Sequence, residues 1–268
     1  MGELLPPTTT TPAPTTTTTT SSSAPSGAGS CSASSTTPPT TSAFSGYSLT
    51  SAVAGPQIPS TSGYYNYGTG GGGIFGANHI KVAGNALEEL GYTDPSVGPG
   101  VVGAGLQLAN DAAPASGGGF TYCYSLSGTT AGWQQAGIVF IAWPQNNAAG
   151  GGEIDFMFAG AQSQGAANWS VMETGGCTNC ATLAQGTYPT GSPSTGIHSV
   201  TVLWKQGVGD SFYIDGKFVT TVPASTAPTP LGNEIPTMQI QDYCSCSSAP
   251  ASAPLTASLY WLATYASS

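Results

Sequence analysis

Two carboxylates stand close together in residues 150–162, the stretch GGGEIDFMFAGAQ. One isoleucine separates Glu153 from Asp155, so in a β-strand their side chains project from the same face, and Met157 is expected beside them. The opposite face then carries apolar side chains, namely Ile154, Phe156 and Phe158. Paired carboxylates serve in nucleophilic and general acid–base catalysis, so this strand is the first candidate for chemistry. The alternative is that the pair only solubilises an exposed sheet face, although two like charges side by side on a strand repel each other.

The strand that carries them belongs to a chain with an all-β pattern beyond residue 43. Short runs rich in aromatic and β-branched residues are interrupted by Gly, Pro, Asn and Ser, and nine such runs are residues 102–110, 119–127, 137–143, 152–160, 167–174, 198–206, 210–222, 236–243 and 257–266. One short helix is expected in residues 85–92, NALEELGY. Strands at this spacing predict a sandwich of two antiparallel sheets with Greek-key connections. If the sandwich is strongly curved, the carboxylates lie on its concave surface.

The charge of the chain excludes several partners. The 268 residues include twelve acidic side chains and three lysines, with no arginine, for a formal net charge of −9. Because so few groups could neutralise phosphate, we expect neither nucleic acid nor an anionic membrane surface as a partner. No apolar run approaches the roughly 18 residues of a membrane-spanning helix, so we expect no membrane insertion.

Residues 1–43 form a separate segment of low complexity. Most of it is Thr, Ser, Pro, Ala and Gly, a composition typical of solvated, O-glycosylated stalks. We therefore predict a disordered stalk or linker at residues 1–43 and a folded domain at residues 44–268. The composition also predicts an extracellular or cell-surface location, although the printed start carries no signal peptide. The alternative is an intracellular disordered tail.

The cysteines fit the extracellular interpretation. There are six, at Cys31, Cys123, Cys177, Cys180, Cys244 and Cys246. An even number permits complete pairing, and secreted domains keep their cysteines oxidised, so disulfides are favoured. The CTNC and CSC pairs could instead bind a metal, but CxC is a poor zinc spacing and neither histidine of the chain lies nearby. We expect no metal and no cofactor, and the pairing of the cysteines stays open.

A set of motifs resembles glycoside hydrolase family 16, the laminarinases and lichenases of the concanavalin A-like lectin and glucanase superfamily. The resemblance rests on GGEIDFMFAG, on GIVFIAWPQNN before it and on GIHSVTVLWKQGVGDSFYIDGKFVTTV after it. The matching positions in these motifs also include Trp143, Pro144, His198, Trp204, Tyr213, Asp215 and Gly216. The likeness covers about residues 63–265. It implies a concanavalin A-like jelly-roll β-sandwich with a concave glycan-binding face.

The family resemblance implies a retaining mechanism on β-linked glucans or galactans, carried by a Glu-x-Asp-x-Glu strand. By that resemblance Glu153 matches the nucleophile, Asp155 matches the residue that orients it, and Met157 occupies the place of the acid/base glutamate. A thioether has no proton to donate, and general acid catalysis contributes roughly 10² to 10⁴ in rate. Some relatives carry the acid one residue later, after a bulge, but that residue here is Phe158.

A replacement acid and residues for sugar recognition are expected on neighbouring strands. Glu173 is the candidate substitute acid closest in sequence and Asp242 is the other, while each could equally be a surface carboxylate. Aromatic rings stack on the C–H faces of sugars, and amides bond to sugar hydroxyl groups. The residues predicted to line the glycan-binding face are Trp133, Trp143, Trp169, Gln239, Gln241 and Tyr243. For each single tryptophan, a place in the core is an equally good alternative.

These observations leave two hypotheses from different classes. The first is a secreted retaining endo-β-glycosidase that hydrolyses β-linked polysaccharide slowly, or with a displaced acid. The second is a non-catalytic carbohydrate-binding or surface-adhesion module that has kept the fold and lost the general acid at Met157. In both cases we expect a monomeric domain whose partner is a β-glucan or related glycan. A structural surface protein with a vestigial site is a third, lower-ranked hypothesis.

Overall fold

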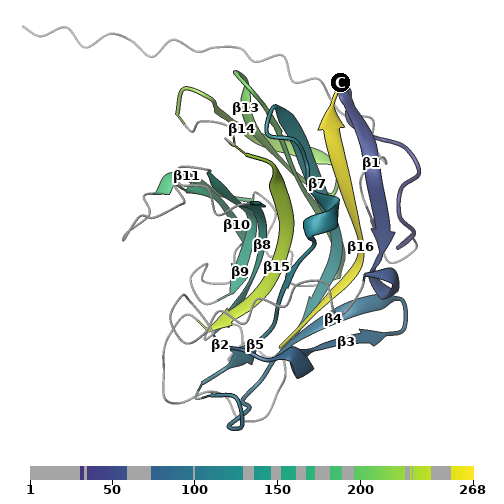
Figure 1. Cartoon of the computed structure of the whole chain (residues 1–268), viewed down its shortest axis with the longest axis vertical. Helices are drawn as coiled ribbons and strands as arrows, with labels where there is room; N and C mark the ends of the chain where they lie inside the picture. Colours follow the sequence, from purple (N-terminus) through teal and green to yellow (C-terminus); the bar gives the residue numbers. More distant parts are fainter. Residues whose placement is uncertain are drawn as a thin grey trace, which may run out of the picture.

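Two antiparallel β-sheets pack face to face in this protein (Figure 1). The computed structural model describes residues 31–32, 35–58, 74–98, 100–128, 136–145, 152–160, 167–172, 182–188, 196–226, 230, 232–242 and 255–268. The helices in these ranges are short 3-10 turns, η1 (Gly55–Gln57), η2 (Ala77–His79) and η3 (Ala109–Asp111). None of these turns has the length and apolar character needed to cross a bilayer. The arrangement confirms the predicted all-β, two-sheet jelly roll.

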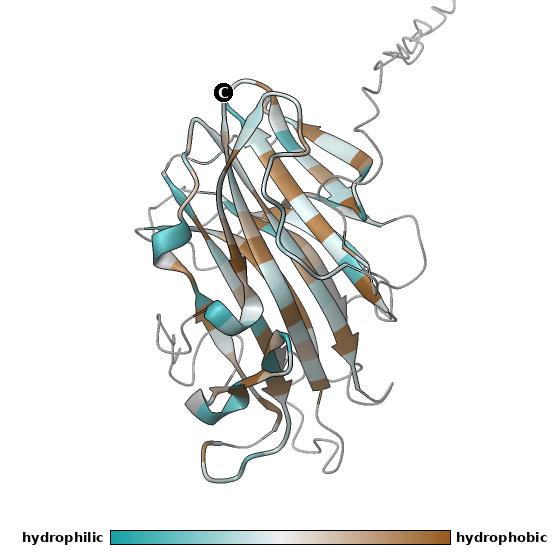
Figure 2. Cartoon of the chain, turned by 90° about the vertical axis from the view of Figure 1, so that its right-hand side faces the viewer, coloured by the Kyte–Doolittle hydropathy of each residue, from teal (hydrophilic) through white to brown (hydrophobic). Residues whose placement is uncertain are grey.

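The larger sheet, the back sheet, has eight strands. Their order is β14-β13-β12-β7-β16-β4-β3, with β1 also paired to β16. The strands are β1 (Tyr47–Ala54), β3 (Ile80–Ala83), β4 (Ala86–Gly91), β7 (Gly117–Ser127), β12 (Ile197–Lys205), β13 (Gly209–Ile214), β14 (Lys217–Pro223) and β16 (Leu255–Ser267). Hydrophobic bands, drawn in brown, alternate with pale bands of intermediate hydropathy along several strands in Figure 2. This period of two lets one face of the sheet supply the core.

The smaller sheet, the front sheet, carries the candidate site. Its six strands follow the order β11-β10-β9-β8-β15-β6. They are β6 (Gly105–Gln107), β8 (Ala136–Pro144), β9 (Glu153–Gly160), β10 (Ala167–Met172), β11 (Thr182–Thr187) and β15 (Glu234–Asp242). A small parallel pair, β2 (Ile74–Phe75) and β5 (Val102–Gly103), forms a third sheet. In Figure 1 the front sheet bends so that its concave face points away from the back sheet.

The main core fills the space between the two sheets. Tyr122 of the back sheet stacks on Phe140 of the front sheet, with ring centroids 4.6 Å apart, and contacts Phe156 at 5.3 Å. Trp204 is fully buried in the same cluster and donates its indole N–H to the carbonyl oxygen of Pro114 at 2.9 Å. Burying each large apolar side chain contributes about 1.5–3 kcal/mol. This packing therefore supports the front sheet from behind.

The helix expected in residues 85–92 is absent, and residues 86–91 form strand β4. The prediction was wrong because the helical preference of Ala, Leu and Glu is weak, and tertiary contacts can override it in setting the secondary structure of a segment. Here β4 pairs with β3 on one side and with β16 on the other. Leu87 lies opposite both Val82 and Leu259 and is fully buried, so sheet pairing overrides the local helical preference.

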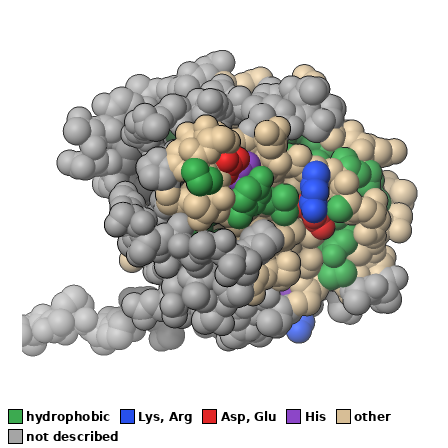
Figure 3. Space-filling model, turned by 90° about the horizontal axis from the view of Figure 1, so that it is seen from below, with side chains coloured by type: hydrophobic (Ala, Val, Ile, Leu, Met, Phe, Trp, Pro, Cys, Tyr) green, Lys and Arg blue, Asp and Glu red, His purple; other side chains and the backbone are tan. Residues whose placement is uncertain are grey.

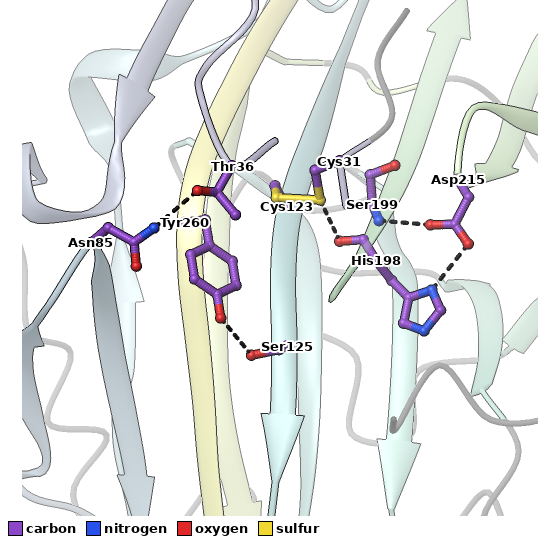
Figure 4. Close-up of a disulfide and its surroundings, with 9 residues drawn as sticks. All are labelled: Cys31, Thr36, Asn85, Cys123, Ser125, His198, Ser199, Asp215 and Tyr260. Atoms are coloured by element: carbon purple, nitrogen blue, oxygen red, sulfur yellow. Dashed lines mark hydrogen bonds and ion pairs between the residues drawn. A yellow bond between two sulfur atoms is a disulfide. The ribbon is translucent and has the colours of Figure 1, made fainter. Parts of the chain in front are cut away.

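The N-terminal part of the described chain is fastened to the outer face of the back sheet (Figure 4). A disulfide joins Cys31 to Cys123, with the two Cα atoms 5.8 Å apart. The ring of Phe44 packs against Tyr213 and Tyr265, with centroid distances of 5.1 and 5.4 Å. Within the described residues, the packed part of the chain therefore already includes Cys31, ahead of the predicted boundary at residue 44. The four other cysteines and residues 1–30 lie outside the described residues.

Candidate active site

Glu153 and Asp155 lie in the first half of β9, on the strand that runs third from one edge of the front sheet. The intervening Ile154 is buried in the core between the sheets, so alternation directs the two carboxyl groups to the concave face. Asp155 lies opposite Ser170 of β10, whose hydroxyl group donates a hydrogen bond to Asp155 Oδ2 at 2.9 Å. The pairing of β9 with β10 thus fixes the orientation of the aspartate.

The two carboxyl groups interact strongly. Burial raises the pKa of Glu153 well above its ordinary value, and the charge of Asp155 and a hydrogen bond with it raise it further. Burial also raises the pKa of Asp155, although the hydrogen bonds with Glu153 and Ser170 act in the opposite direction. Two carboxylates that meet at a buried site cannot both ionise easily. The pair therefore shares the remaining proton once the first has been lost, and either member can be the ionised one.

A β-bulge interrupts β9 immediately after Asp155. In the register with β8, Asp155 lies opposite Ile141 but Met157 lies opposite Phe140, so one extra residue of β9 is inserted at this point. The extra residue shifts the alternation of side chains by one. Met157 is 0% exposed and belongs to the same core cluster as Ile154. The predicted place of Met157 on the carboxylate face is therefore wrong: it is a core residue.

After Asp155, the next residue of β9 in register with the concave face is number 158 and not Met157. Its backbone pairs with Val139 on one side and with Asn168 on the other. Val139 is absent from the core cluster that holds its neighbours Ile138 and Phe140, so it belongs to the concave face. The residue after Asp155 on this face is thus number 158, and it is a phenylalanine. The register leaves no carboxylate at this place in β9.

Cross-strand pairing defines two rows of residues on the concave face. The row through Asp155 consists of Ser170, Asp155, Ile141, Thr237 and Gln107. The row beside it consists of Asn168, residue 158, Val139, Gln239 and Gly105. Several polar atoms in these rows are buried without a hydrogen-bond partner, namely Asn168 Oδ1, Thr237 Oγ1, Gln239 Oε1 and Gln107 Nε2. The floor of this face is therefore lined by neutral amide and hydroxyl groups beside the carboxyl pair.

The structure places the predicted sugar-binding residues in different environments. Gln239 lies on the concave face, and Trp143 occupies the same face of β8 as Ile141. Trp169 is in the core, which corrects its predicted role: it is 8% exposed and stacks on Phe212 of the back sheet at 4.6 Å. Its indole lies over Gly186 of β11, where any Cβ would collide with it. Gln241 is in β15, but its side chain and the residues Trp133, Glu173 and Tyr243 lie outside the described parts.

Sequence reasoning missed three polar residues of this face, Ser170, Thr237 and Gln107. Each of them is adjacent in sequence to a core residue and so points to the opposite face of its strand, as Thr237 does one residue before Met238. That alternation was visible in the sequence, but the residue opposite each one depends on strand register. Asp242, the second candidate substitute acid, is the last residue of β15, and its side chain is outside the described parts.

His198 stands away from the carboxyl pair, at the beginning of β12 (Figure 4). Its Nδ1 lies 3.0 Å from Asp215 Oδ2, and Asp215 Oδ1 accepts a hydrogen bond from the backbone N–H of Ser199. Asp215 has a positive φ of 49° in the turn between β13 and β14. The histidine therefore ties a hairpin turn to its neighbouring strand. Within the described ranges, no three metal-ligating side chains come together.

Comparison with known proteins agrees with this architecture. The sequence profile described as "Glycosyl hydrolases family 16" matches residues 115–259, which is more than half of the chain. The match spans β7 to β15 and so includes the carboxyl pair. None of the curated proteins compared with the chain is similar enough to count as a match.

Several solved structures share the fold at low sequence identity. A β-1,3-1,4-glucanase (lichenase) derived from a mouse hindgut metagenome is 18% identical, with a TM-score of 0.59 over 75% of this chain and 90% of that chain. An endo-1,3-β-glucanase from Streptomyces sioyaensis is 16% identical, with a TM-score of 0.60 over 84% and 98%. A structure from work on endo-acting O-glycanases of the human gut microbiota that initiate mucin breakdown is 14% identical, with a TM-score of 0.60 over 77% and 93%.

Proposed function

Because the chain belongs to glycosyl hydrolases family 16, we propose that it is a secreted protein that binds β-glucan on the concave face of its front sheet and cleaves it slowly by a retaining mechanism. The observation that carries this proposal is the Glu153–Asp155 pair, held on the concave face with Ser170 bound to Asp155 at 2.9 Å. Such a pair supplies a nucleophile and a neighbouring group that can take up its proton.

The proposed reaction has two steps. When the shared proton resides on Asp155, the Glu153 carboxylate attacks the anomeric carbon, a C–O ester bond forms and the glycosidic C–O bond breaks. Water then attacks the same carbon and gives up a proton to the solvent, the ester bond breaks and the Glu153 carboxylate is restored. Two displacements at one carbon retain its configuration. Asp155 acts by accepting the proton that Glu153 must lose before it can attack.

The departing oxygen of the sugar also needs a proton, and this strand does not provide one. Neither Met157 nor Phe158 is an acid, and the register puts position 158 where the next concave-face residue stands. The proton must then come from water or from a carboxyl group on another segment. Lack of a positioned acid costs roughly 10² to 10⁴ in rate, so we expect slow turnover of natural glucan and normal reaction of substrates with an activated leaving group.

The surroundings of the pair favour a neutral polysaccharide. Unpartnered amide and hydroxyl atoms of Asn168, Thr237, Gln239 and Gln107 suit the hydroxyl groups of a sugar, which both donate and accept hydrogen bonds. Charged side chains are sparse on the described surface in the view of Figure 3. An anionic polysaccharide would find few counter-charges in a chain with three lysines. The known activities of the lichenase and the endo-1,3-β-glucanase of the same fold point to β-glucan.

Secretion is supported by two features. Residues 1–43 have the composition of an extracellular stalk. The Cys31–Cys123 disulfide is of the kind that persists in oxidising compartments.

A second candidate function is glycan binding without catalysis. The observation that favours it is the lack of a carboxylate at both positions 157 and 158. The amide and hydroxyl rows would bind glycan in either case. The two candidates therefore differ only in whether Glu153 forms a covalent bond to the sugar.

Trapping of the covalent intermediate separates the candidates. The full chain would be incubated with a 2,4-dinitrophenyl 2-deoxy-2-fluoro-β-glucan oligosaccharide, whose leaving group needs no acid. We expect one added glycosyl unit in the intact mass, located by peptide mapping to Glu153, and none in Glu153→Gln. Binding to lichenan, laminarin and mucin O-glycans would be measured in parallel. Glucan binding without an adduct would establish a binding module. If the chain forms no adduct and also does not bind glucan, both candidates are overturned.

A further inference from the structure

Three carboxyl groups outside the candidate site are buried between the sheets. Glu89 of β4, Asp210 of β13 and Glu234 of β15 are each 0% exposed. All six of their carboxyl oxygen atoms lack a hydrogen-bond partner. An ionised carboxylate in such surroundings is very unfavourable, so these groups fold as neutral acids. Their number is notable in a chain with only twelve acidic residues.

Strand register explains why each of these side chains is buried. Glu89 lies opposite Ile80 and Ala257 and shares the inner face of β4 with Leu87. Its neighbour Glu88 points the other way and pairs with Lys81 at 3.3 Å. Two adjacent glutamates thus have opposite environments, one ion-paired at the surface and one in the core.

Asp210 and Glu234 approach each other from opposite sheets. Asp210 lies opposite the core residues Trp204 and Val222 of the back sheet. Glu234 lies opposite Pro144 at the beginning of β15 in the front sheet. Burial raises the pKa of Asp210 to about 7, and burial together with the charge of Asp210 raises that of Glu234 to about 10. Ionisation of both groups would place two like charges between the layers.

The titratable groups around the three acids bring no positive charge. The groups that interact with them are Tyr122 for Glu89, Tyr47 and Glu234 for Asp210, and Glu153 and Asp210 for Glu234. In the described chain, the cationic side chains lie elsewhere: Lys81 is paired with Glu88, Lys205 and Lys217 are exposed, His79 contacts Leu90 and Asp94, and His198 contacts Asp215. Loss of the protons would therefore leave buried negative charge without compensation.

We propose that Glu89, Asp210 and Glu234 form an acid latch: the two sheets pack stably while these three groups carry protons, and the packing loosens as the protons are lost. The latch makes this a protein for acidic media. Its members lie in the core, so the inference does not depend on the sugar-binding function.

The sign and size of the effect follow from proton linkage. A carboxyl group whose pKa is higher in the folded state than in the unfolded state stabilises the fold fully at pH values below the unfolded pKa. That stability is lost as the pH rises to the folded pKa. Each such group lowers the ratio of folded to unfolded protein about tenfold per pH unit in this interval. For Asp210 the interval runs from 3.8 to about 7, which corresponds to about 10³-fold.

Urea unfolding of the full chain from pH 4 to 9 tests the latch. We expect the folded-to-unfolded ratio of the natural chain to fall steeply with rising pH. Asp210→Asn should remove about 10³-fold of that fall below pH 7, and Glu89→Gln and Glu234→Gln should each flatten the profile from the ordinary glutamate pKa of 4.5 upward. Glu88→Gln is the matched control, because this adjacent glutamate is ion-paired at the surface, and it should keep the natural slope. A natural profile that is flat or rises with pH, or core variants that keep the natural slope, would overturn the latch.

A second measurement needs no variant. Unfolding of the natural chain at pH 6.5 in weak buffer should release about two protons or more, because the buried acids ionise once they reach water. No release, or net uptake, would overturn the proposal even if a core variant failed to fold.

Discussion

Phe158→Glu is the substitution that should restore general acid catalysis. The bulge after Asp155 places position 158 opposite Val139, in the register of the concave face. A glutamate introduced there would rise beside the carboxyl pair and could protonate the departing sugar oxygen. The expected gain is about 10² to 10⁴ in the rate of glucan hydrolysis, equivalent to about 3–5 kcal/mol in the activation barrier.

Met157→Glu is the matched comparison, one residue earlier in the same strand. Met157 is fully buried in the core, so this glutamate would enter the space between the sheets. It would lose the packing of the methionine and bury a polar group without a partner. Together these effects cost about 3–5 kcal/mol of unfolding free energy, a large part of the 5–15 kcal/mol typical of a native protein. No gain in hydrolysis is expected.

The assay is release of reducing ends from lichenan and laminarin, together with urea unfolding of both variants. The bulged register predicts faster hydrolysis with near-natural stability for Phe158→Glu, and lower stability without faster hydrolysis for Met157→Glu. The reverse pattern would mean that β9 is regular and that Met157 occupies the catalytic face. No gain from either variant would mean that more than the acid is missing from the site.

Three further predictions follow from the same structure. Trp169→Ala should lower the unfolding free energy by about 3–5 kcal/mol, because Trp169 is in the core. Trp143→Ala should weaken glucan binding and cost less stability. Equal losses of unfolding free energy in urea would contradict the assignment of one tryptophan to the core and the other to the concave face. Reduction of the Cys31–Cys123 disulfide should lower the unfolding free energy by about 2–4 kcal/mol, measured with and without a reductant, and an unchanged midpoint would show that the link contributes nothing. Because the pKa of Glu153 is raised and only its ionised form attacks, the rate of dinitrophenolate release should rise with pH while the chain stays folded; a rate that falls from acid to neutral pH would exclude Glu153 as the nucleophile.

The sequence was sufficient for the architecture of the sandwich. Alternating strands, turn residues and the motifs around Glu153 correctly predicted two antiparallel sheets. Local propensity failed at β4, where residues typical of a helix are paired on both sides with other strands. The same strand buries Glu89, which no rule based on polarity would place in a core. Such a position depends on long-range pairing, and the local sequence does not contain it.

The site was harder to predict because one inserted residue, at the bulge in β9, determines which face each later residue of the strand occupies. Strict alternation predicts Met157 beside Asp155, but the bulge reverses the face of every residue after it. Trp169 was assigned to sugar binding because tryptophan suits both a glycan face and a core. Only the register, which puts its indole over Gly186 and against Phe212, distinguishes the two.

The most direct test of the proposed function is a crystal structure of the chain with a β-1,3-1,4-gluco-oligosaccharide. We expect the sugar to lie along the concave face of the front sheet, with one anomeric carbon about 3–3.5 Å from a carboxylate oxygen of Glu153. Its hydroxyl groups should contact Gln239, Thr237 or Gln107. An oligosaccharide bound elsewhere on the chain, with the Glu153–Asp155 pair untouched, would contradict the account.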